Sequence, residues 1–408
     1  MTISTESYKG VRDFYPEDMF IQKYLFDTMR RAVESFGYLE YNASILESTE
    51  LYKAKSGEEI INEQTYSFKD RGERDVTLRP EMTPTVARMV AAKRRELSFP
   101  LRWYSIPNLF RYEKPQRGRL REHWQLNVDI FGVENTTAEQ EIITLSASIM
   151  HAFGAKPTDY EIRINSRISL QENISKKLRS PDLYTKAIKL LDRKDKISGE
   201  DFKKEWSTLS EEPAEFEIPV SEGVKNLIET LKNQGITNIV YSPLLARGFD
   251  YYTDIVFEIY DTNPENPRAL FGGGRYDDLL SIFGSDKVPA VGFGMGDVTL
   301  RDFLEVHNLL PTYTPSAKLY IAHADGAESK DITSLASNIR NAGINVITDI
   351  TDKKVGDQIK KASKDSVPFV IVLGATEITS GIYQLKNMST GDIKAVNETE
   401  LINELRSI

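Results

Sequence analysis

Residues 125–130 alternate strictly between polar and apolar side chains. Gln125, Asn127 and Asp129 hold the odd positions, and leucine, valine and isoleucine hold the even ones. Since successive side chains of a strand point to opposite faces, this pattern predicts a strand with one apolar and one polar face. We expect the apolar face to join the core and the polar face to line a site.

A helical period precedes this strand. Between about residue 17 and residue 36 the apolar side chains recur at helical intervals before a glycine, which predicts a long amphipathic helix. From residue 56 to residue 149 the pattern changes to short strands, with one helical stretch after the first of them. Their hairpin-like spacing predicts an antiparallel sheet.

The rest of the chain divides into further segments, which together predict an α+β fold. Residues 169–235 are helical and charge-dense, and we expect them to form a helical insertion. Strands resume afterwards, so the sheet domain is expected to be discontinuous, with residues 1–168 and 236–310. A proline-bearing polar stretch predicts a linker at 311–316. Alternating strands and helices over 317–408 predict a mostly parallel α/β domain.

Composition bounds the possibilities. The chain has 408 residues, of which 40% are hydrophobic and 28% charged, as in ordinary globular proteins of more than one domain. Its first residues lack a basic region followed by an apolar core, and no segment approaches the roughly 20 apolar residues that a membrane span needs. A cytoplasmic protein without membrane association is expected.

The metal chemistry is restricted by the composition. Cysteine is absent, which excludes disulfides, thiolate zinc sites and a cysteine nucleophile. The four histidines show no spacing typical of zinc sites, so any bound metal is expected to be magnesium. A net charge of −9 argues against a nucleic-acid packaging protein, although phosphate contacts depend on local basic patches.

One such patch lies just before the alternating strand. Arg111 and Glu113 are two residues apart and are expected on one face of a strand. A forked guanidinium suits phosphate oxygens, and a carboxylate can accept a hydrogen bond from an exocyclic amine, so the pair could hold ATP at both ends. The alternative is a surface ion pair on an exposed strand. The following loop, Lys114–Arg121, carries four cations and is suited to an anion.

Three other segments carry candidate ligands, and each has a purely structural alternative. Glu81 follows an Arg-Pro pair and could bind an ammonium group or stand in a solvated turn. Tyr251 and Tyr252 follow Arg247 closely and could line a site or pack in the core. The glycines at 272–274 permit close backbone approach or positive φ, but they match neither the dinucleotide-binding nor the P-loop pattern.

Taken in order, these motifs resemble those of histidyl-tRNA synthetases, a family of class II aminoacyl-tRNA synthetases. The resemblance covers essentially the whole chain and is carried by KGVRDFYPED, TLRPEMT, FRYEKPQRGRLREHWQ, ARGFDYYT, GGGRYD and GFGMGD. It implies a class II antiparallel catalytic domain with a helical insertion and a C-terminal α/β anticodon-binding domain. It also implies a homodimer that uses ATP with Mg²⁺ and acts on histidine and tRNA(His).

The resemblance assigns an ATP site. It places Arg111 at the α-phosphate, Glu113 at the adenine amine and Arg119 among the phosphate contacts. His123 stands where an adenine-stacking phenylalanine is common, and an imidazole can still stack. Thr299 stands where the class II arginine that grips the γ-phosphate is expected.

The resemblance also assigns the histidine site. Its imidazole is expected between Tyr252 and Asp129, which replaces the more usual glutamate, and each would meet one ring nitrogen. Glu81 and Thr83 are expected at the α-amino group, and Gln125 at the carboxylate or the α-phosphate. The full expected set is Glu81, Thr83, Gln125, Asp129, Arg247, Tyr251 and Tyr252.

The implied chemistry has two steps. The histidine carboxylate attacks the α-phosphorus and pyrophosphate leaves, so positioning and cation stabilisation should dominate, and Arg111 and Arg247 take the catalytic roles. Histidine then passes to the terminal ribose of tRNA, with Gln116 and Arg117 in the loop that approaches the acceptor end.

Two other functions share the same resemblance. A non-catalytic histidine-sensing regulatory subunit of ATP phosphoribosyltransferase would typically lose the catalytic arginines and the C-terminal domain, whereas this chain keeps Arg111, Arg247 and an α/β tail. An RNA-binding stress sensor would normally carry attached signalling domains. A histidine–tRNA ligase is therefore the function that the sequence favours.

Overall fold

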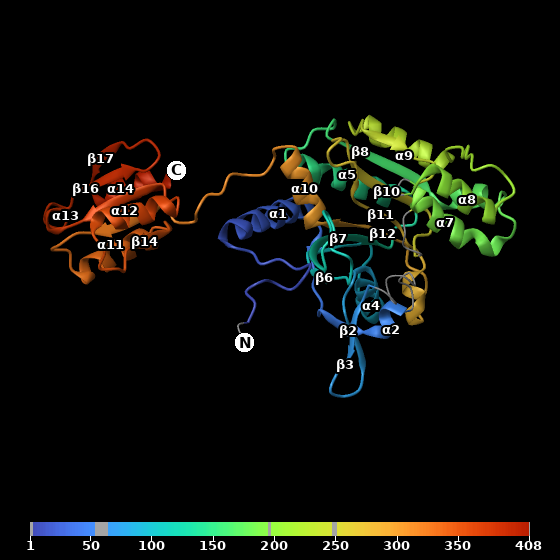
Figure 1. Ribbon diagram of the computed structural model, residues 1–408, viewed down its shortest axis with the longest axis horizontal. Coiled ribbons are helices and arrows are strands. Elements are labelled where there is room, and N and C mark those ends of the chain that lie inside the picture. The colour runs from blue at the N-terminus through green and yellow to red at the C-terminus, as the bar shows by residue number, and fades with distance from the viewer. Residues whose placement is uncertain (1–2, 54–63, 195–196, 247–250, 408) are drawn as a thin grey trace. The chain divides into compact units, whose positions relative to one another are not determined.

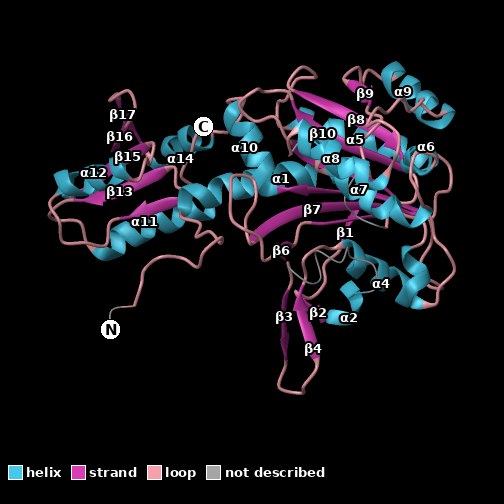
Figure 2. Ribbon diagram, turned by 45° about the vertical axis from the view of Figure 1, so that its right-hand side comes forward, coloured by secondary structure: helices cyan, strands magenta, loops and turns pink. Residues whose placement is uncertain are grey.

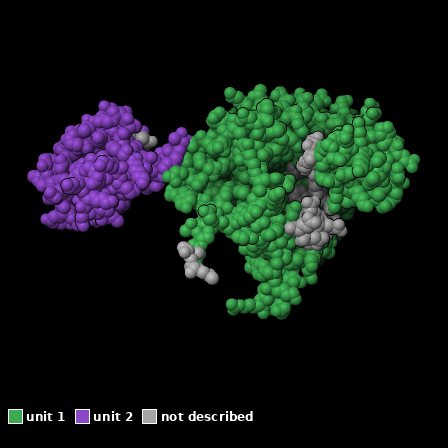
Figure 3. All heavy atoms as spheres, in the orientation of Figure 1, with its two compact units in different colours: residues 1–311 green, residues 312–408 purple. Residues whose placement is uncertain are grey.

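The computed structural model describes residues 3–53, 64–194, 197–246 and 251–407 (Figure 1). The chain divides into two units, residues 1–311 and 312–408 (Figure 3). The division falls at the start of the predicted linker. Among the described residues, none of the helices has both the length and the apolar character that a membrane crossing requires.

A mainly antiparallel sheet organises the first unit, as the sequence predicted. In the described part of the chain its strands run in the order β1-β5-β7-β12-β11-β10-β8-β9, and β6 pairs with β7. Only the pairs β1–β5 and β8–β9 are parallel within these strands. Their bounds are β1 Leu39–Glu40, β5 Leu101–Ser105, β6 Asn108–Phe110, β7 Glu122–Phe131, β8 Tyr160–Ser166, β9 Ile239–Tyr241, β10 Ile255–Asp261, β11 Ala269–Arg275 and β12 Ala290–Gly296.

Four helices cover one face of this sheet and form the main core (Figure 1). The first of them shows why: Leu25, Met29 and Val33 recur every four residues and are fully buried, while Pro16 occupies its first turn. The apolar side chains of β7 and β10 meet these helices from the sheet. The helices are α1 (Pro16–Ser35), α5 (Thr137–Ala152), α9 (Glu222–Asn233) and α10 (Asp297–Val306).

The opposite side of the sheet is covered only in part. There α4 (Thr83–Lys93) and the 3₁₀ helix η3 (Leu279–Phe283) pack with aromatic side chains into a smaller core. Tyr251, Tyr252 and Tyr276 belong to this core. It stands beside the polar face of β7, so these tyrosines border the predicted site.

A small antiparallel sheet, in the order β2-β4-β3, extends away from the large one (Figure 2). Just before β2, the Ser44 hydroxyl accepts a hydrogen bond from the Leu46 amide at 3.2 Å. The buried Arg79 guanidinium donates to the Ala43 carbonyl at 2.8 Å. These bonds hold the backbone on both sides of the bend at Ile45. The elements here are β2 Leu46–Ser48, α2 Thr49–Lys53, β3 Tyr66–Lys69 and β4 Asp75–Leu78.

The region predicted as an insertion is helical, with a core of its own around Trp206 and Phe202. Its last helix, α9, differs from the others because Val224, Leu227 and Leu231 pack into the main core of the sheet domain. The remaining elements of this region are α6 Arg167–Ser175, η1 Pro181–Leu183, α7 Tyr184–Asp192 and α8 Gly199–Leu209.

The second unit contains a sheet in the order β14-β13-β15-β16-β17 with helices packed against it. The first three strands are parallel, as predicted, whereas β16 and β17 form an antiparallel edge that the pattern did not indicate. The elements are β13 Leu319–His323, α11 Ser329–Asn341, β14 Val346–Thr348, α12 Val355–Lys364, β15 Phe369–Leu373, α13 Ala375–Ser380, β16 Tyr383–Asn387, β17 Ile393–Val396 and α14 Glu398–Arg406.

Candidate active site

Strand β7 divides core from site, as its alternation predicted. Leu126, Val128 and Ile130 belong to the main core. Gln125, Asn127 and Asp129 line a pocket on the other face. The predicted two-faced strand is therefore confirmed.

We call this pocket the inner pocket, and its empty volume is about 410 Å³. It brings together side chains from β7, from the Glu81 turn and from the tyrosine segment. Six of the predicted histidine-site residues lie here. The lining comprises Glu81, Thr83, Arg111, Gln125, Asn127, Asp129, Tyr251, Tyr252, Gly272, Tyr276, Gly292, Phe293 and Gly294.

A second space, the outer pocket, adjoins the first and has an empty volume of about 920 Å³. The two pockets share Arg111, Gln125 and Gly294. These residues mark the boundary at which ligands in the two pockets would touch. The outer lining comprises Arg111, Glu113, Gly118, Arg119, Leu120, His123, Gln125, Glu258, Ala269, Leu270, Phe271, Gly294, Gly296, Val298 and Thr299.

Glycines on β12 make room for the polar face of β7. Gly292 pairs with Asp129 across the sheet, and a Cβ at Gly292 would collide with the Asp129 carboxylate. A Cβ at Gly294 would stand 2.8 Å from Gln125 Cδ. Glycine is required here because both polar side chains lean over the neighbouring strand.

The glycine run at 272–274 is also strand and not a turn, because it lies within β11. Of the two alternatives that the sequence left open, close backbone approach and positive φ, the second is not found, because none of these glycines has a positive φ. Gly272 pairs with Gly294 and lines the inner pocket. Close packing is the reason for these glycines: a Cβ at Gly273 or Gly274 would strike the backbone of a neighbouring strand.

Asp129 is a buried carboxyl group of the inner pocket. Burial raises its pKa to about 7, and a hydrogen bond donated by the Tyr276 hydroxyl acts in the opposite direction. Because ordinary aspartates titrate near 4, this group changes charge close to neutral pH. The charge of the Asp129 carboxyl group can therefore change when a ligand that carries a proton binds.

Tyrosines form the wall opposite Asp129. The Tyr251 hydroxyl donates to Glu81 Oε2 at 3.1 Å, and its ring lies 5.0 Å from that of Tyr252 and 5.9 Å from that of Tyr276. Tyr276 was not among the site residues predicted from the sequence. The period of two along β11, from Gly272 through Gly274, could have placed it on the pocket face.

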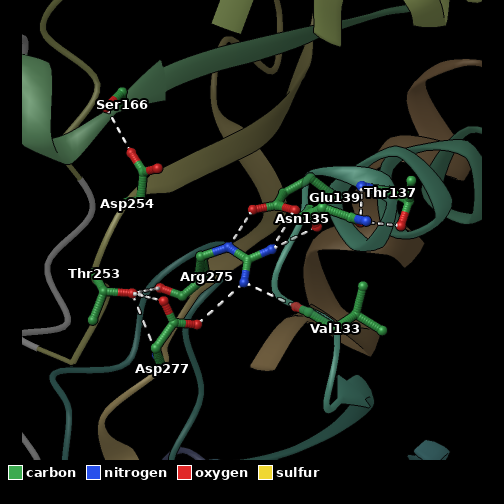
Figure 4. Close-up of polar contacts among 9 residues, drawn as sticks. All are labelled: Val133, Asn135, Thr137, Glu139, Ser166, Thr253, Asp254, Arg275 and Asp277. Atoms are coloured by element: carbon green, nitrogen blue, oxygen red, sulfur yellow. Dashed lines mark hydrogen bonds and ion pairs between the residues drawn. The ribbon is translucent and has the colours of Figure 1, made fainter. Parts of the chain in front are cut away.

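Arg275 precedes Tyr276 and is committed to a structural network (Figure 4). Its Nε and Nη2 donate to both oxygens of Glu139 at 2.6 and 2.7 Å. Its other donors reach Asp277 and the carbonyls of Val133 and Asn135. A guanidinium has five N–H donors, and all of them are used, so Arg275 is not available to an anion.

This network also holds the backbone next to two of the three pocket tyrosines, Tyr252 and Tyr276. The Thr253 amide donates to the Arg275 carbonyl at 2.8 Å, and its hydroxyl lies 3.3 Å from Asp277 Oδ2. Thr253 follows Tyr252 and Arg275 precedes Tyr276. The backbone beside each tyrosine is therefore held by the same buried ion pair.

Arg111 and Glu113 were predicted to share a strand face, but β6 ends at Phe110, so the strand assignment was wrong. Both side chains nevertheless line the outer pocket. Arg111 Nε donates to the Pro80 carbonyl at 2.9 Å, next to Glu81. Arg119 forms a loose ion pair with Glu113 at 3.7 Å.

The cations of the Lys114–Arg121 loop do not all face the same way. Arg121 is buried, donates to the Tyr8 hydroxyl at 3.1 Å and stacks on the Tyr112 ring at 4.1 Å. It therefore stabilises the loop and does not face an anion. Gln116 and Arg119 line an outer hollow together with Lys114. Arg117 approaches Asp302 at 3.8 Å.

His123 and Thr299 line the outer pocket. Burial, aided by the charges of Arg111 and Arg12, lowers the pKa of His123 to about 3, so its imidazole is neutral at physiological pH. The Thr299 hydroxyl donates to the Leu270 carbonyl at 2.8 Å. Arg301 pairs with Asp18 at 3.0 Å and does not line either pocket.

Arg247, predicted at the α-phosphate, lies outside the described residues, as does Asp250 beside it. Glu258 is an outer-pocket residue that the sequence analysis did not select, although its place opposite the core face of β10 followed from the alternation there. Among the described residues, no group of three or more histidine, aspartate or glutamate side chains is arranged to hold a metal ion.

The antiparallel sheet, the paired pockets on its open face and the separate α/β unit together define a class II aminoacyl-tRNA synthetase. Within that class, a sequence model described as histidyl-tRNA synthetase matches residues 10–214 and 179–298, and one described as an anticodon binding domain matches residues 319–408. The chain belongs to the histidyl-tRNA synthetase family.

Known proteins agree with this assignment over the full length. The chain is 40% identical to the histidine–tRNA ligase of Leptospira biflexa, over 99% of this chain and 98% of that one. It is 38% identical to that of Thermoplasma volcanium, over 97% of each. The fold matches the crystal structure of histidyl-tRNA synthetase from Nostoc sp. PCC 7120 with a TM-score of 0.81 at 22% identity, covering 100% of both chains.

Proposed function

We propose that this chain is a histidine–tRNA ligase, which activates histidine with ATP to histidyl-adenylate and pyrophosphate and then transfers histidine to the 3′ end of tRNA(His). The observation that carries the proposal is the boundary between the pockets, which share Arg111 and Gln125. Adenylation requires an amino-acid carboxylate and the α-phosphate of ATP to meet. Two adjoining pockets with an arginine at their junction supply that geometry.

Histidine fits the inner pocket by its polar groups. Asp129 accepts a hydrogen bond from one imidazole nitrogen, and Tyr252 faces the other. Tyr276 holds the Asp129 carboxylate through its hydroxyl. Glu81 and Thr83 receive the α-amino group, with Tyr251 fixing the Glu81 carboxylate. Side chains that lack two ring nitrogens would leave buried polar groups unsatisfied and would be rejected.

ATP fits the outer pocket. Glu113 accepts from the adenine amine, and the neutral His123 ring stacks on the base. Arg111 and Arg119 contact the phosphates. Mg²⁺ needs only one or two carboxylates besides phosphate oxygens and water, so Glu258 in this lining fits such an ion. When bound, the ion would neutralise charge on the phosphates.

In the first step a histidine carboxylate oxygen forms a bond to the α-phosphorus. The bond from that phosphorus to the bridging oxygen breaks, and its electron pair leaves with pyrophosphate. No proton is removed from the ionised carboxylate, so the protein acts by alignment and charge stabilisation. Arg111 lies at the point of reaction, and we assign Arg247 to the same phosphate.

In the second step the terminal ribose hydroxyl of tRNA attacks the carbonyl carbon of the adenylate, and AMP leaves. Gln116 and Arg117 belong to the exposed loop beside the outer pocket, which suits them to contact the acceptor end. Within this proposal residues 1–168 and 236–310 form the catalytic domain, 169–235 the insertion and 317–408 the anticodon-binding domain, joined at 311–316.

Assembly and location follow as further parts of the proposal. Leu39 and Leu46 are 68% and 45% exposed in the segment after α1, and apolar side chains of this kind would be covered when two copies associate. We therefore propose a homodimer. Because its substrates are tRNA, histidine and ATP, we propose a cytoplasmic location.

A second candidate is a histidine-sensing regulatory subunit. A solved structure titled as an ATP phosphoribosyltransferase regulatory subunit/histidyl-tRNA synthetase, from Bacillus halodurans C, shares the fold with a TM-score of 0.72 at 22% identity, covering 88% of this chain and 97% of that one. The outer pocket with Arg111, Glu113 and Arg119 favours the ligase, since a sensor of histidine alone needs only the inner pocket.

The test is amino-acid-dependent exchange of labelled pyrophosphate into ATP, run with each amino acid in turn. We expect exchange with histidine and background rates with the others. Histidine binding without pyrophosphate exchange would favour the histidine-sensing function over the ligase function. An Arg111→Ala variant is the control for contamination, because it should bind histidine while exchange falls by at least about 100-fold.

A further inference from the structure

The charged side chains that line the outer pocket, among the described residues, do not provide a net positive field for a triphosphate. Its lining contains Arg111 and Arg119 among the cations and Glu113 and Glu258 among the anions, and the imidazole beside them is neutral. Thr299 contributes a hydroxyl that is already directed to the Leu270 carbonyl. A triphosphate with one bound Mg²⁺ still carries net negative charge, so a further protein cation near this neutral lining would favour its binding.

Arg268 is one of the described cations that lie beside this pocket. It directly precedes β11, whose first residues Ala269 and Leu270 are lining residues. Its Nη1 donates to the Arg117 carbonyl at 3.0 Å, and a Cβ placed on the lining residue Gly118 would collide with the same nitrogen. The guanidinium thus lies directly behind the pocket wall at Gly118.

Asp302 holds this arginine loosely. Its Oδ2 atom lies 3.6 Å from Arg268 Nη1 and 3.8 Å from Arg117 Nε, and this buried oxygen makes no hydrogen bond among the described residues. Burial raises the pKa of Asp302, and the two arginines oppose that shift. A carboxylate shared at such distances leaves both guanidinium groups able to turn to a more highly charged partner.

The position of Arg268 also matches the missing cation at 299. Asp302 is three residues after Thr299 on α10, so both face β11. The Thr299 hydroxyl bonds to the carbonyl of Leu270, which lies two residues after Arg268 in the chain. Arg268 contacts Asp302 and Leu270 contacts Thr299, so residues two apart in this segment meet positions one turn apart on α10.

We propose that Arg268 binds the terminal phosphates of ATP in place of a cation at position 299, and that Asp302 holds it beside the pocket before the nucleotide enters. The inference rests on the proposed use of ATP. Arg268 suits this task better than Arg117, because it is attached to a strand of the main sheet and its side chain is 30% exposed, against 52% for Arg117.

The experiment compares the dissociation constants of ATP and AMP for the full chain by calorimetry. AMP has the adenine and α-phosphate but lacks the phosphates assigned to Arg268. For Arg268→Ala we expect ATP binding to weaken by about 10- to 100-fold and AMP binding to change by less than about twofold. Arg268→Lys should recover part of the ATP affinity. Arg301→Ala, on the same helix as Asp302 but paired with Asp18, is the matched control and should change neither constant.

Equal losses for ATP and AMP, or no loss for either, would overturn the proposal, because a structural arginine would move both or neither. Asp302→Asn gives a test that keeps Arg268 in place: ATP binding should be unchanged or tighter, and weaker binding of ATP alone would contradict the holding role. Failure of the unmodified protein to exchange pyrophosphate with histidine would count against the ligase function instead, independently of the ATP-to-AMP contrast.

Discussion

The Tyr276 hydroxyl donates a hydrogen bond to the Asp129 carboxylate across an intervening strand. Tyr276 follows β11, Asp129 lies on β7, and β12 runs between them. Gly292 on β12 is the residue that pairs with Asp129, and its missing side chain leaves the path open. The inner pocket therefore depends on three features that meet at the same position in the sheet. They are the Asp129 carboxylate, the Tyr276 hydroxyl and the lack of a side chain at Gly292.

Asp129→Asn should stabilise the free protein at alkaline pH while weakening histidine binding. Burial raises the Asp129 pKa from 3.8 to about 7. Between these values the unfolded chain releases a proton that the folded chain retains, so this group makes stability fall as pH rises, with no further loss above about pH 7. Thermal unfolding should give the same Tm for the parent protein and the variant at pH 4. At pH 8 the variant should have the higher Tm.

The same Asp129→Asn variant should raise the histidine KM in pyrophosphate exchange, because an amide oxygen is a weaker acceptor than a carboxylate for the imidazole N–H. A histidine KM like that of the parent would remove Asp129 from the recognition of the ring. A stability difference that did not change with pH would show that the carboxyl is not held protonated in the fold.

His123→Ala should raise the ATP KM by about 5- to 100-fold through loss of stacking, whereas His123→Phe should retain most of the affinity. Since the pKa of His123 is about 3, its contribution should not vary between pH 6 and pH 9. ATP KM values across this range provide the measurement. Substitution of the exposed His151, at the end of α5, is the control and should leave the ATP KM unchanged. A change in the ATP KM near pH 6.5 that is lost in His123→Phe would contradict a neutral His123 ring.

Gly292→Ala should impair histidine binding, because the added methyl group collides with the Asp129 carboxylate and forces it to move. Overpacking of this kind costs about 1–3 kcal/mol, which corresponds to a rise of about 5- to 150-fold in the histidine KM if the strain falls on the bound state. Gly223→Ala is the matched control, since nothing lies within 4 Å of a Cβ there. Similar histidine KM values for both variants would refute the need for glycine at 292.

Arg275→Ala should lower the free energy of unfolding by about 3–5 kcal/mol, because it leaves the buried Glu139 carboxylate without its partner. Arg193→Ala removes an exposed pair with Glu205 and should cost at most about 1 kcal/mol. Denaturant unfolding of both variants measures the difference. Comparable small losses would show that the network in Figure 4 does not hold the site.

Much of the site was predictable where a pattern had a period. The alternation of Gln125, Asn127 and Asp129 with apolar residues determined both faces of β7, and the resemblance brought Glu81 and Tyr252 to the same pocket. The long first helix followed from its spacing in the same way. Such patterns are local, so a sequence shows them directly.

The errors concern residues whose conformation depends on distant partners. Glycines at 272–274 suit a turn as well as a strand, and only the neighbours on β10 and β12 decide between them. Arg121 is as cationic as Arg111, but stacking on the Tyr112 ring turns it inward. Tyr276 needed the position of Asp129, which lies 147 residues away along the chain.

The most direct test of the central claim is the charging of tRNA by the unmodified protein. Purified tRNA(His) would be incubated with ATP and each labelled amino acid in turn, and label on the 3′ end would be counted. The proposed function predicts that histidine alone is transferred and that transfer requires ATP. Absence of histidyl-tRNA, with histidine still bound by the protein, would contradict it.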